Sequence, residues 1–149
     1  MTDLIIDLRY NGGGLLSVAD TMMDLLAGMT ATGEPSFKIQ VNDQHPEFNN
    51  DQDFWGFFDE LPDTFSPIRI AFITSRSTAS ASELVINGLH PHIDSVMVGG
   101  NTFGKQVGQG RWDLHELVDG LEREDCDVAL RLTAFEIVNG ENEGGYHQV

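Results

Sequence analysis

The residues best suited to chemistry in this sequence lie in short turns rich in small side chains. The segment Ala79-Ser-Ala-Ser-Glu83 places two serines among alanines, at a point where we expect a strand to lead into a helix. Small neighbours let a substrate carbonyl approach a serine hydroxyl, and the free N–H groups of a first helical turn point to where an oxyanion would form. The alternative is that Ser80 or Ser82 only caps the helix, and the segment taken alone favours that alternative.

A second turn, Asn11-Gly-Gly-Gly14, also stands between an expected strand and an expected helix. Glycines permit unusual backbone angles and close approach by a ligand, so a second oxyanion donor could come from this turn. The other interpretation is an ordinary tight connection, which this segment alone again favours.

A glycine-rich loop over Gly99–Gly110 carries a single lysine, Lys105. Its first part has the glycines and the lysine of a phosphate-binding loop in register, but Gln106 stands where Ser or Thr should hold magnesium. No helical pattern opens at Lys105 either. We therefore do not expect a nucleotide to bind here.

Other candidate sites are weaker. The run Asn49-Asn-Asp-Gln-Asp53 resembles the start of a calcium loop, but the required glycine and glutamate are missing in either register. A Ser–His–Asp triad could use His90 or His92, yet no GxSxG motif presents the serine. Without an HExxH motif or a Cys/His cluster, we expect neither a metal nor a cofactor.

The pattern of apolar residues indicates the elements that must position these turns. It predicts four strands and two helices: strands over Asp3–Leu8, Arg69–Thr74, Ile93–Val98 and Ala129–Val138, and helices over Leu15–Ala27 and Ala79–Leu89. Gly28 is expected to end the first helix and Pro91 the second. The order strand, glycine turn, helix is typical of an α/β fold.

Composition limits the class of protein further. A chain of 149 residues can form one domain with a real core, and its formal net charge of −16 disfavours nucleic acids and anionic membranes as partners. The charge would mildly favour cationic substrates, although solubility alone explains it better. No apolar run is long enough to cross a bilayer.

Two further features need separate expectations. Cys126 is the only cysteine, so any disulfide partner lies outside this chain, and its acidic neighbours make it a poor nucleophile. The segment 42–63 holds seven acids, no lysine or arginine, and five aromatic residues. We expect it to be a surface excursion that folds back on its aromatic rings, and a second acidic stretch covers 113–127.

Three segments together resemble the carboxyl-terminal processing, or tail-specific, serine protease family. Asp7-Leu-Arg-Tyr-Asn-Gly-Gly-Gly-Leu-Leu16 is similar to the family's DLRxNxGG turn, Thr78-Ala-Ser-Ala-Ser-Glu83 to its nucleophile turn, and Thr102-Phe-Gly-Lys-Gln-Val-Gly-Gln109 to its TFGKxxxQ loop. The family's separation of 25 positions between nucleophile and base recurs between Ser80 and Lys105. Three motifs in order at the right spacing are far more specific than any one of them.

The resemblance implies an α/β fold of the Clp protease/crotonase-like type, with a core of stacked β-β-α units. It implies that Ser80 is the nucleophile, that Lys105 is the general base and that Gln109 orients Lys105. The oxyanion hole would use the backbone N–H groups of Ala81 and Gly14, with Gly13 nearby.

These roles set a physical requirement. A lysine accepts a proton only when it is neutral, and an apolar, carboxylate-free surrounding favours the neutral form. Phe103, Val107 and glycines flank Lys105 in the sequence. We therefore expect Lys105 to be buried and to have no carboxylate partner.

The resemblance also implies what surrounds the core. We expect residues 1–149 to be a single catalytic core domain from a longer protein, without the PDZ domain and flanking segments that family members carry. Protein or peptide substrates, an envelope, periplasmic or secreted location, and membrane contact only through segments outside this chain are implied in the same way. The sequence does not indicate an oligomeric state.

Two alternatives stay open at this point. One is a catalytically silent relative that binds peptides, which the joint presence of Ser80, Lys105 and Gln109 disfavours. The other is a crotonase-like enzyme acting on thioesters, which the Ser–Lys spacing disfavours because such enzymes rely mainly on oxyanion donors.

Overall fold

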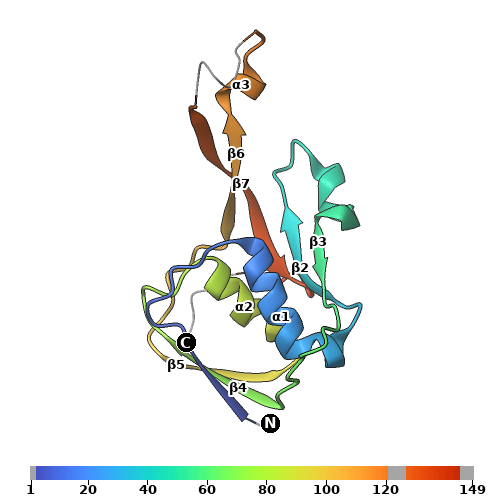
Figure 1. Cartoon of the computed structure of the whole chain (residues 1–149), viewed down its shortest axis with the longest axis vertical. Coiled ribbons are helices and arrows are strands. Elements are labelled where there is room, and N and C mark those ends of the chain that lie inside the picture. Colours follow the sequence, from blue (N-terminus) through green and yellow to red (C-terminus); the bar gives the residue numbers. More distant parts are fainter. Residues whose placement is uncertain (1–2, 121–126, 145–149) are drawn as a thin grey trace.

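A parallel sheet and two helices form the body of the molecule. The computed structural model describes residues 3–120 and 127–144. Strands β1 (Asp3–Asp7), β4 (Arg69–Thr74) and β5 (Asp94–Gly99) run parallel in the order β1-β4-β5. Helices α1 (Leu16–Ala31) and α2 (Ala81–Leu89) lie together over this sheet (Figure 1). The predicted α/β class is confirmed.

A second, antiparallel sheet extends from this body. Its strands, in spatial order β3-β2-β7-β6, are β3 (Trp55–Phe57), β2 (Pro35–Gln40), β7 (Ala129–Asn139) and β6 (Val107–Asp113). Strand β7 is long enough to pair with β2 through its second half and with β6 along most of its length. The β6–β7 ribbon, with the short helix α3 (Leu114–Leu117), projects away from the body (Figure 1).

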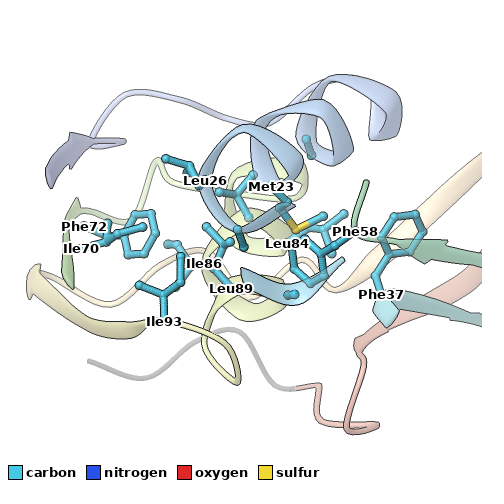
Figure 2. Packing of buried hydrophobic residues seen from close by; sticks show 14 of the residues in the cluster. Met23, Leu26, Phe37, Phe58, Ile70, Phe72, Leu84, Ile86, Leu89 and Ile93 are labelled. Atoms are coloured by element: carbon cyan, nitrogen blue, oxygen red, sulfur yellow. The ribbon is translucent and has the colours of Figure 1, made fainter. Parts of the chain in front are cut away.

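The hydrophobic core lies between the helices and the parallel sheet. Met23 and Leu26 of α1, Leu84 and Leu89 of α2 and Phe72 of β4 belong to one buried cluster. Figure 2 shows these side chains packed together, with Phe58 and Phe37 extending the cluster toward the second sheet. Because α2 is buried on nearly every side, its first residues, and therefore Ser80, have a fixed position.

The prediction that Gly28 ends the first helix is wrong. Helix α1 continues to Ala31, and Gly28 is buried inside it. A β-carbon at Gly28 would lie 2.1 Å from the carbonyl oxygen of Asp59. The glycine therefore permits close approach of the 59–60 backbone and does not terminate the helix.

The acidic segment 42–63 agrees only in part with the expected surface excursion. Two short 3-10 helices, η1 (Pro46–Asn50) and η2 (Gln52–Phe54), lie at the surface. The ring centroids of Phe48 and Phe54 are 5.4 Å apart. The next residues instead enter the fold, because β3 pairs with β2 and Phe58 is fully buried. The excursion is thus fixed to the core at its end.

A buried carboxyl group at this junction leads to a stability prediction. Asp24 accepts a hydrogen bond from the Asp59 backbone N–H at 2.9 Å, and burial raises the pKa of the Asp24 carboxyl. A raised folded-state pKa means that stability falls as pH rises through the range above the ordinary carboxyl value. We expect Asp24→Asn to keep the hydrogen bond and to raise Tm by a few degrees near pH 7, with the gain vanishing toward pH 4.

Thermal unfolding of both proteins from pH 4 to pH 8 measures this effect. Asp53→Asn is the matched control, because Asp53 is exposed and the same charge is removed. A gain from Asp24→Asn that is constant across the pH range would contradict the explanation.

Candidate active site

The serine turn has an unusual backbone. Ser80 immediately precedes α2, and its φ of 57° and ψ of −120° lie outside the regions that most residues occupy. Such strain persists only where the surroundings enforce it, and it is concentrated at functional sites. The N–H of Ala81, the first residue of α2, lies at the positive end of the helix dipole.

The glycine turn packs directly against the serine turn. Gly13 has a φ of +94°, and a β-carbon there would lie 2.6 Å from the Ala79 carbonyl oxygen and 2.8 Å from the Ala81 nitrogen. The Ala79 N–H donates to the Asn11 carbonyl at 3.2 Å, and Asn11 Oδ1 accepts from the Gly13 N–H at 3.0 Å. The two turns that the sequence analysis singled out are therefore neighbours.

Buried Thr78 joins these turns to the end of β1 and to the lysine loop. Its Oγ1 donates to the Leu8 carbonyl at 2.7 Å and accepts from the Ser75 N–H at 3.1 Å. Its carbonyl accepts from the Phe103 N–H at 2.9 Å. One fully buried residue thus contacts all three segments that carry the family resemblance.

Glu83 connects the serine turn to the lysine loop even more directly. Its carboxylate is 1% exposed and accepts three backbone N–H groups: Ser80 at 2.7 Å, Gly104 at 2.6 Å and Lys105 at 2.9 Å. The first of these bonds is one half of a capping box. Because the other two cross to the loop, Glu83 sets where the backbone of Lys105 lies relative to Ser80.

The predicted catalytic residues line one pocket, which we call the Ser80 pocket. Ser80, Lys105 and Gln109 line it together with Gly14 and Ala81, and its volume is about 240 Å³. Apolar residues from the neighbouring strands complete the wall: Val107, Phe135 and Ile137. The structure therefore brings the nucleophile, base and oxyanion candidates together, although they come from three segments.

Lys105 is half-buried, less than expected. Within the ranges 3–120 and 127–144, its ammonium makes no ion pair, and Glu83 binds only its backbone N–H. The structure gives no hydrogen bond between Ser80 and the Lys105 ammonium. Gln109 is exposed and lies at a register shift between β6 and β7, a feature that redirects side chains.

A second pocket, which we call the apolar pocket, adjoins the Ser80 pocket. The two share Gly14, Leu15 and Ala81, and Gly13 lines the apolar pocket. Its other walls are largely aliphatic side chains: Leu8, Val18, Met22 and Val85. The oxyanion candidates therefore stand between an aliphatic pocket on one side and the base on the other.

The surface beside the glycine turn carries a paired charge. Arg9 donates to both carboxylate oxygens of Asp7, with 2.7 Å between Nη2 and Oδ2, and this hydrogen bonding lowers the pKa of Asp7 to about 2. The Asp7 carboxylate at the end of β1 is thus paired with Arg9, two residues farther along the chain.

The structure excludes two alternatives for the site. His90 and His92 lie beyond the far end of α2, about 13 Å from its start, and neither lines the Ser80 pocket. Lys105 leads into strand β6 and not a helix, so the phosphate-loop geometry is absent.

Among the described residues there is no group of three or more His, Cys, Asp or Glu side chains that could hold a metal. Cys126 lies outside those residues.

Gly13 supports a direct test of the paired turns. We expect Gly13→Ala to strain the backbone and push the serine turn away, with a loss of more than about 2 kcal/mol in unfolding free energy and of any catalytic activity. Gly33→Ala is the matched control, since Gly33 has a φ of +80° but no atom within 4 Å of an added β-carbon. It should cost only about 1–2 kcal/mol and leave activity unchanged. Equal losses in both variants, measured by chemical denaturation, would argue against the packing explanation.

Two residues that shape the site, Glu83 and Arg131, were not predicted from the sequence. Glu83 stood inside the quoted motif, and its position three residues after Ser80 is the signal for a capping box. Arg131 also lines the Ser80 pocket, but its position depends on the pairing of β7 with β6, which no local sequence pattern indicates.

The fold and these turns define the class of the molecule, an α/β core with a strained serine beside a lysine. The model for peptidase family S41 matches residues 1–147. The chain belongs to peptidase family S41, which confirms the resemblance to carboxyl-terminal processing proteases.

Relatives with known names agree with this assignment. The chain is 31% identical over 116 residues to the tail-specific protease of Haemophilus influenzae. The matched region covers 78% of this chain but 15% of that protein. An S41 protease structure from Bacteroides fragilis matches with a TM-score of 0.73 at 23% identity, over 96% of this chain and 34% of that one. The photosystem II D1 C-terminal processing protease matches with a TM-score of 0.65 at 21% identity, over 97% and 32%. The shared fold confirms the predicted Clp protease/crotonase-like α/β core, and the chain spans about a third or less of each of these relatives.

Proposed function

We propose that this chain is the catalytic core of a serine endopeptidase that cuts proteins or peptides near their C-termini. The observation that carries the proposal is the strained Ser80 at the start of α2, in one pocket with Lys105 and Gln109. Family membership favours peptide hydrolysis over thioester chemistry. The names of two relatives, a tail-specific protease and a C-terminal processing protease, favour cleavage near C-termini.

In the proposed reaction, Ser80 Oγ attacks the scissile carbonyl carbon while neutral Lys105 Nζ accepts the hydroxyl proton. The N–H groups of Ala81 and Gly14 stabilise the resulting oxyanion, and Gly13 keeps their two turns together. Lys105 then gives its proton to the leaving amine as the C–N bond breaks, which leaves an ester on Ser80. Water then attacks this ester while Lys105 accepts one of its protons. Lys105 donates that proton to Ser80 Oγ as the ester C–O bond breaks and the acid product departs.

The surroundings of Lys105 agree with this scheme. No described carboxylate pairs with the Lys105 ammonium, and apolar residues line its pocket. Hydrogen bonds between nucleophile and base are often long without substrate and shorten in the complex, so the missing Ser80–Lys105 bond does not oppose the roles. Gln109 lines the same pocket, from which it would orient the lysine.

The proposal extends to the setting of the enzyme. We infer an envelope, periplasmic or secreted location, supported by the tail-specific protease relative and by a matching lipoprotein structure from Streptococcus agalactiae. None of the helices in the described ranges is long and apolar enough to span a membrane.

Labelling with a serine-directed fluorophosphonate tests the proposal. The full-length protein should be labelled, and Ser80→Ala should abolish the label. Ser82→Ala is the matched control, since Ser82 lies in the same turn but does not line the Ser80 pocket. A wild-type protein that folds but takes no label would support the silent peptide-binding relative instead.

A further inference from the structure

Arg131 places a positive charge in the Ser80 pocket. It lies on β7, and Phe135 and Ile137 of the same strand line the same pocket. The pairing with β6 skips Ala134, so a bulge separates Arg131 from Phe135 and Ile137, and it is the shared pocket that places the three residues on one side. Arg131 is therefore on the substrate side of the ribbon, although the reaction scheme gives it no role.

No structural role explains this arginine. In the ranges 3–120 and 127–144 the side chain of Arg131 makes no ion pair or hydrogen bond. It stands directly opposite Arg111 in the β6–β7 pairing, and like charges in opposite positions destabilise a sheet. Arg111 is neutralised by Asp113 at 2.7 Å, whereas no carboxylate in the described ranges pairs with Arg131. In a chain with 24 acids and only eight lysines and arginines, an arginine at the pocket that no described acid pairs with points to an anionic ligand.

The chemistry indicates which part of a substrate meets Arg131. In the scheme above, Lys105 protonates the leaving amine, so the leaving peptide must lie on the side of the base. That side is the Ser80 pocket, whose far wall is formed by β6 and β7. The acyl part would lie toward the apolar pocket, beyond Gly14 and Ala81.

Spacing along β7 limits the length of the leaving peptide. Phe135 stands opposite Gly108, close to the lysine loop, and Arg131 lies four residues farther along the strand. Because Ala134 is an extra residue in β7, the three steps of β6 from Gly108 to Arg111 span the same separation, which is about 10–13 Å, or three to four residues of a peptide running beside the ribbon.

We propose that Arg131 binds the C-terminal carboxylate of the substrate, so that the site favours release of a short C-terminal peptide of about three to four residues. A guanidinium can hold a carboxylate through two parallel hydrogen bonds, which gives geometric selectivity as well as attraction. The proposal rests on the proposed endopeptidase function and adds a specificity residue to it.

Matched peptides test this assignment in the full-length protein. Two quenched fluorescent peptides share one sequence, with an apolar residue before the scissile bond and four residues after it; one ends in a free acid and the other in an amide. Wild type should cleave the free-acid peptide with a kcat/KM on the order of 10–100-fold higher than that for the amide peptide. Arg131→Ala should reduce kcat/KM for the free-acid peptide to the value for the amide peptide. Arg111→Ala is the matched control and should keep the preference.

Other readouts separate the possible failures. Fluorophosphonate labelling, which needs no carboxylate, should be equal in wild type and Arg131→Ala, and Arg131→Gln serves if the alanine variant does not fold. Labelled enzymes that show no acid preference, or a preference that survives loss of Arg131, would overturn the assignment. An amidated peptide ending in Glu that is cleaved as fast as the acid would also overturn it, in favour of an acidic side chain. Absence of both labelling and cleavage in wild type would overturn the endopeptidase function itself.

Discussion

Replacing Lys105 by alanine is expected to lower kcat for peptide hydrolysis by about 10⁴-fold while the protein stays folded. The loss is large because no other described side chain in the Ser80 pocket is suited to accept the serine proton: Gln109 has no basic group and Arg131 stays protonated. The fold should tolerate the change, since Lys105 is only half-buried and its ammonium has no described partner.

Two other variants separate a base from a mere positive charge. Lys105→Arg keeps the charge but cannot lose its proton, so it should be as inactive as the alanine variant. Lys38→Ala is the matched control, because Lys38 is the only other lysine and stands over Trp55 with its Nζ 3.0 Å from Asn142 Oδ1. It should lower Tm and leave kcat nearly unchanged. Activity retained in Lys105→Arg would mean that Lys105 acts by charge alone.

The sequence predicted the elements whose signals are local. The apolar runs of β1, β4 and β5 and the periodicity of α2 lie within one or two residues of their predicted bounds. The serine and glycine turns were also found, since glycine and small residues mark a strand-to-helix connection wherever it occurs.

Of the antiparallel strands, β7 lies within one residue of its predicted bounds, whereas β2, β3 and β6 were not predicted, for a different reason. The sequence of β6, Val-Gly-Gln-Gly-Arg-Trp-Asp, has two glycines and little alternation, and its strand is held by pairing with β7. β2 likewise depends on β7 and β3 on either side. Such tertiary pairing cannot be read from a local pattern, and the position of Arg131 depends on it as well.

The connection between the two proposed catalytic segments could not be predicted from the sequence either. Ser80 and Lys105 are 25 positions apart, and no periodicity relates them. The residue that joins them is Glu83, whose local signal predicts a helix cap and says nothing of its two bonds to the lysine loop. Its importance can therefore be judged only by removing it.

Glu83→Gln should lower both the labelling rate and kcat by about 10–100-fold and cost about 2–4 kcal/mol of unfolding free energy. The two carboxylate oxygens of Glu83 accept three N–H groups. Glutamine offers one oxygen, and its amide N–H groups would face backbone donors, so at least one bond is lost and the others lose their charge. The Ser80 turn and the lysine loop would then separate or shift, and misplacement of about 1 Å is enough to cost this much in rate.

Measurement below the Tm of both proteins separates positioning from stability. Glu34→Gln is the matched control, since Glu34 is exposed and the net charge changes equally. A purely structural glutamate would lower Tm without changing the labelling rate of the molecules that remain folded. If Glu83 positions the two segments, the labelling rate falls even where the variant is fully folded. The effect should also be much smaller in combination with Lys105→Ala, because a displaced base matters only while there is a base to displace.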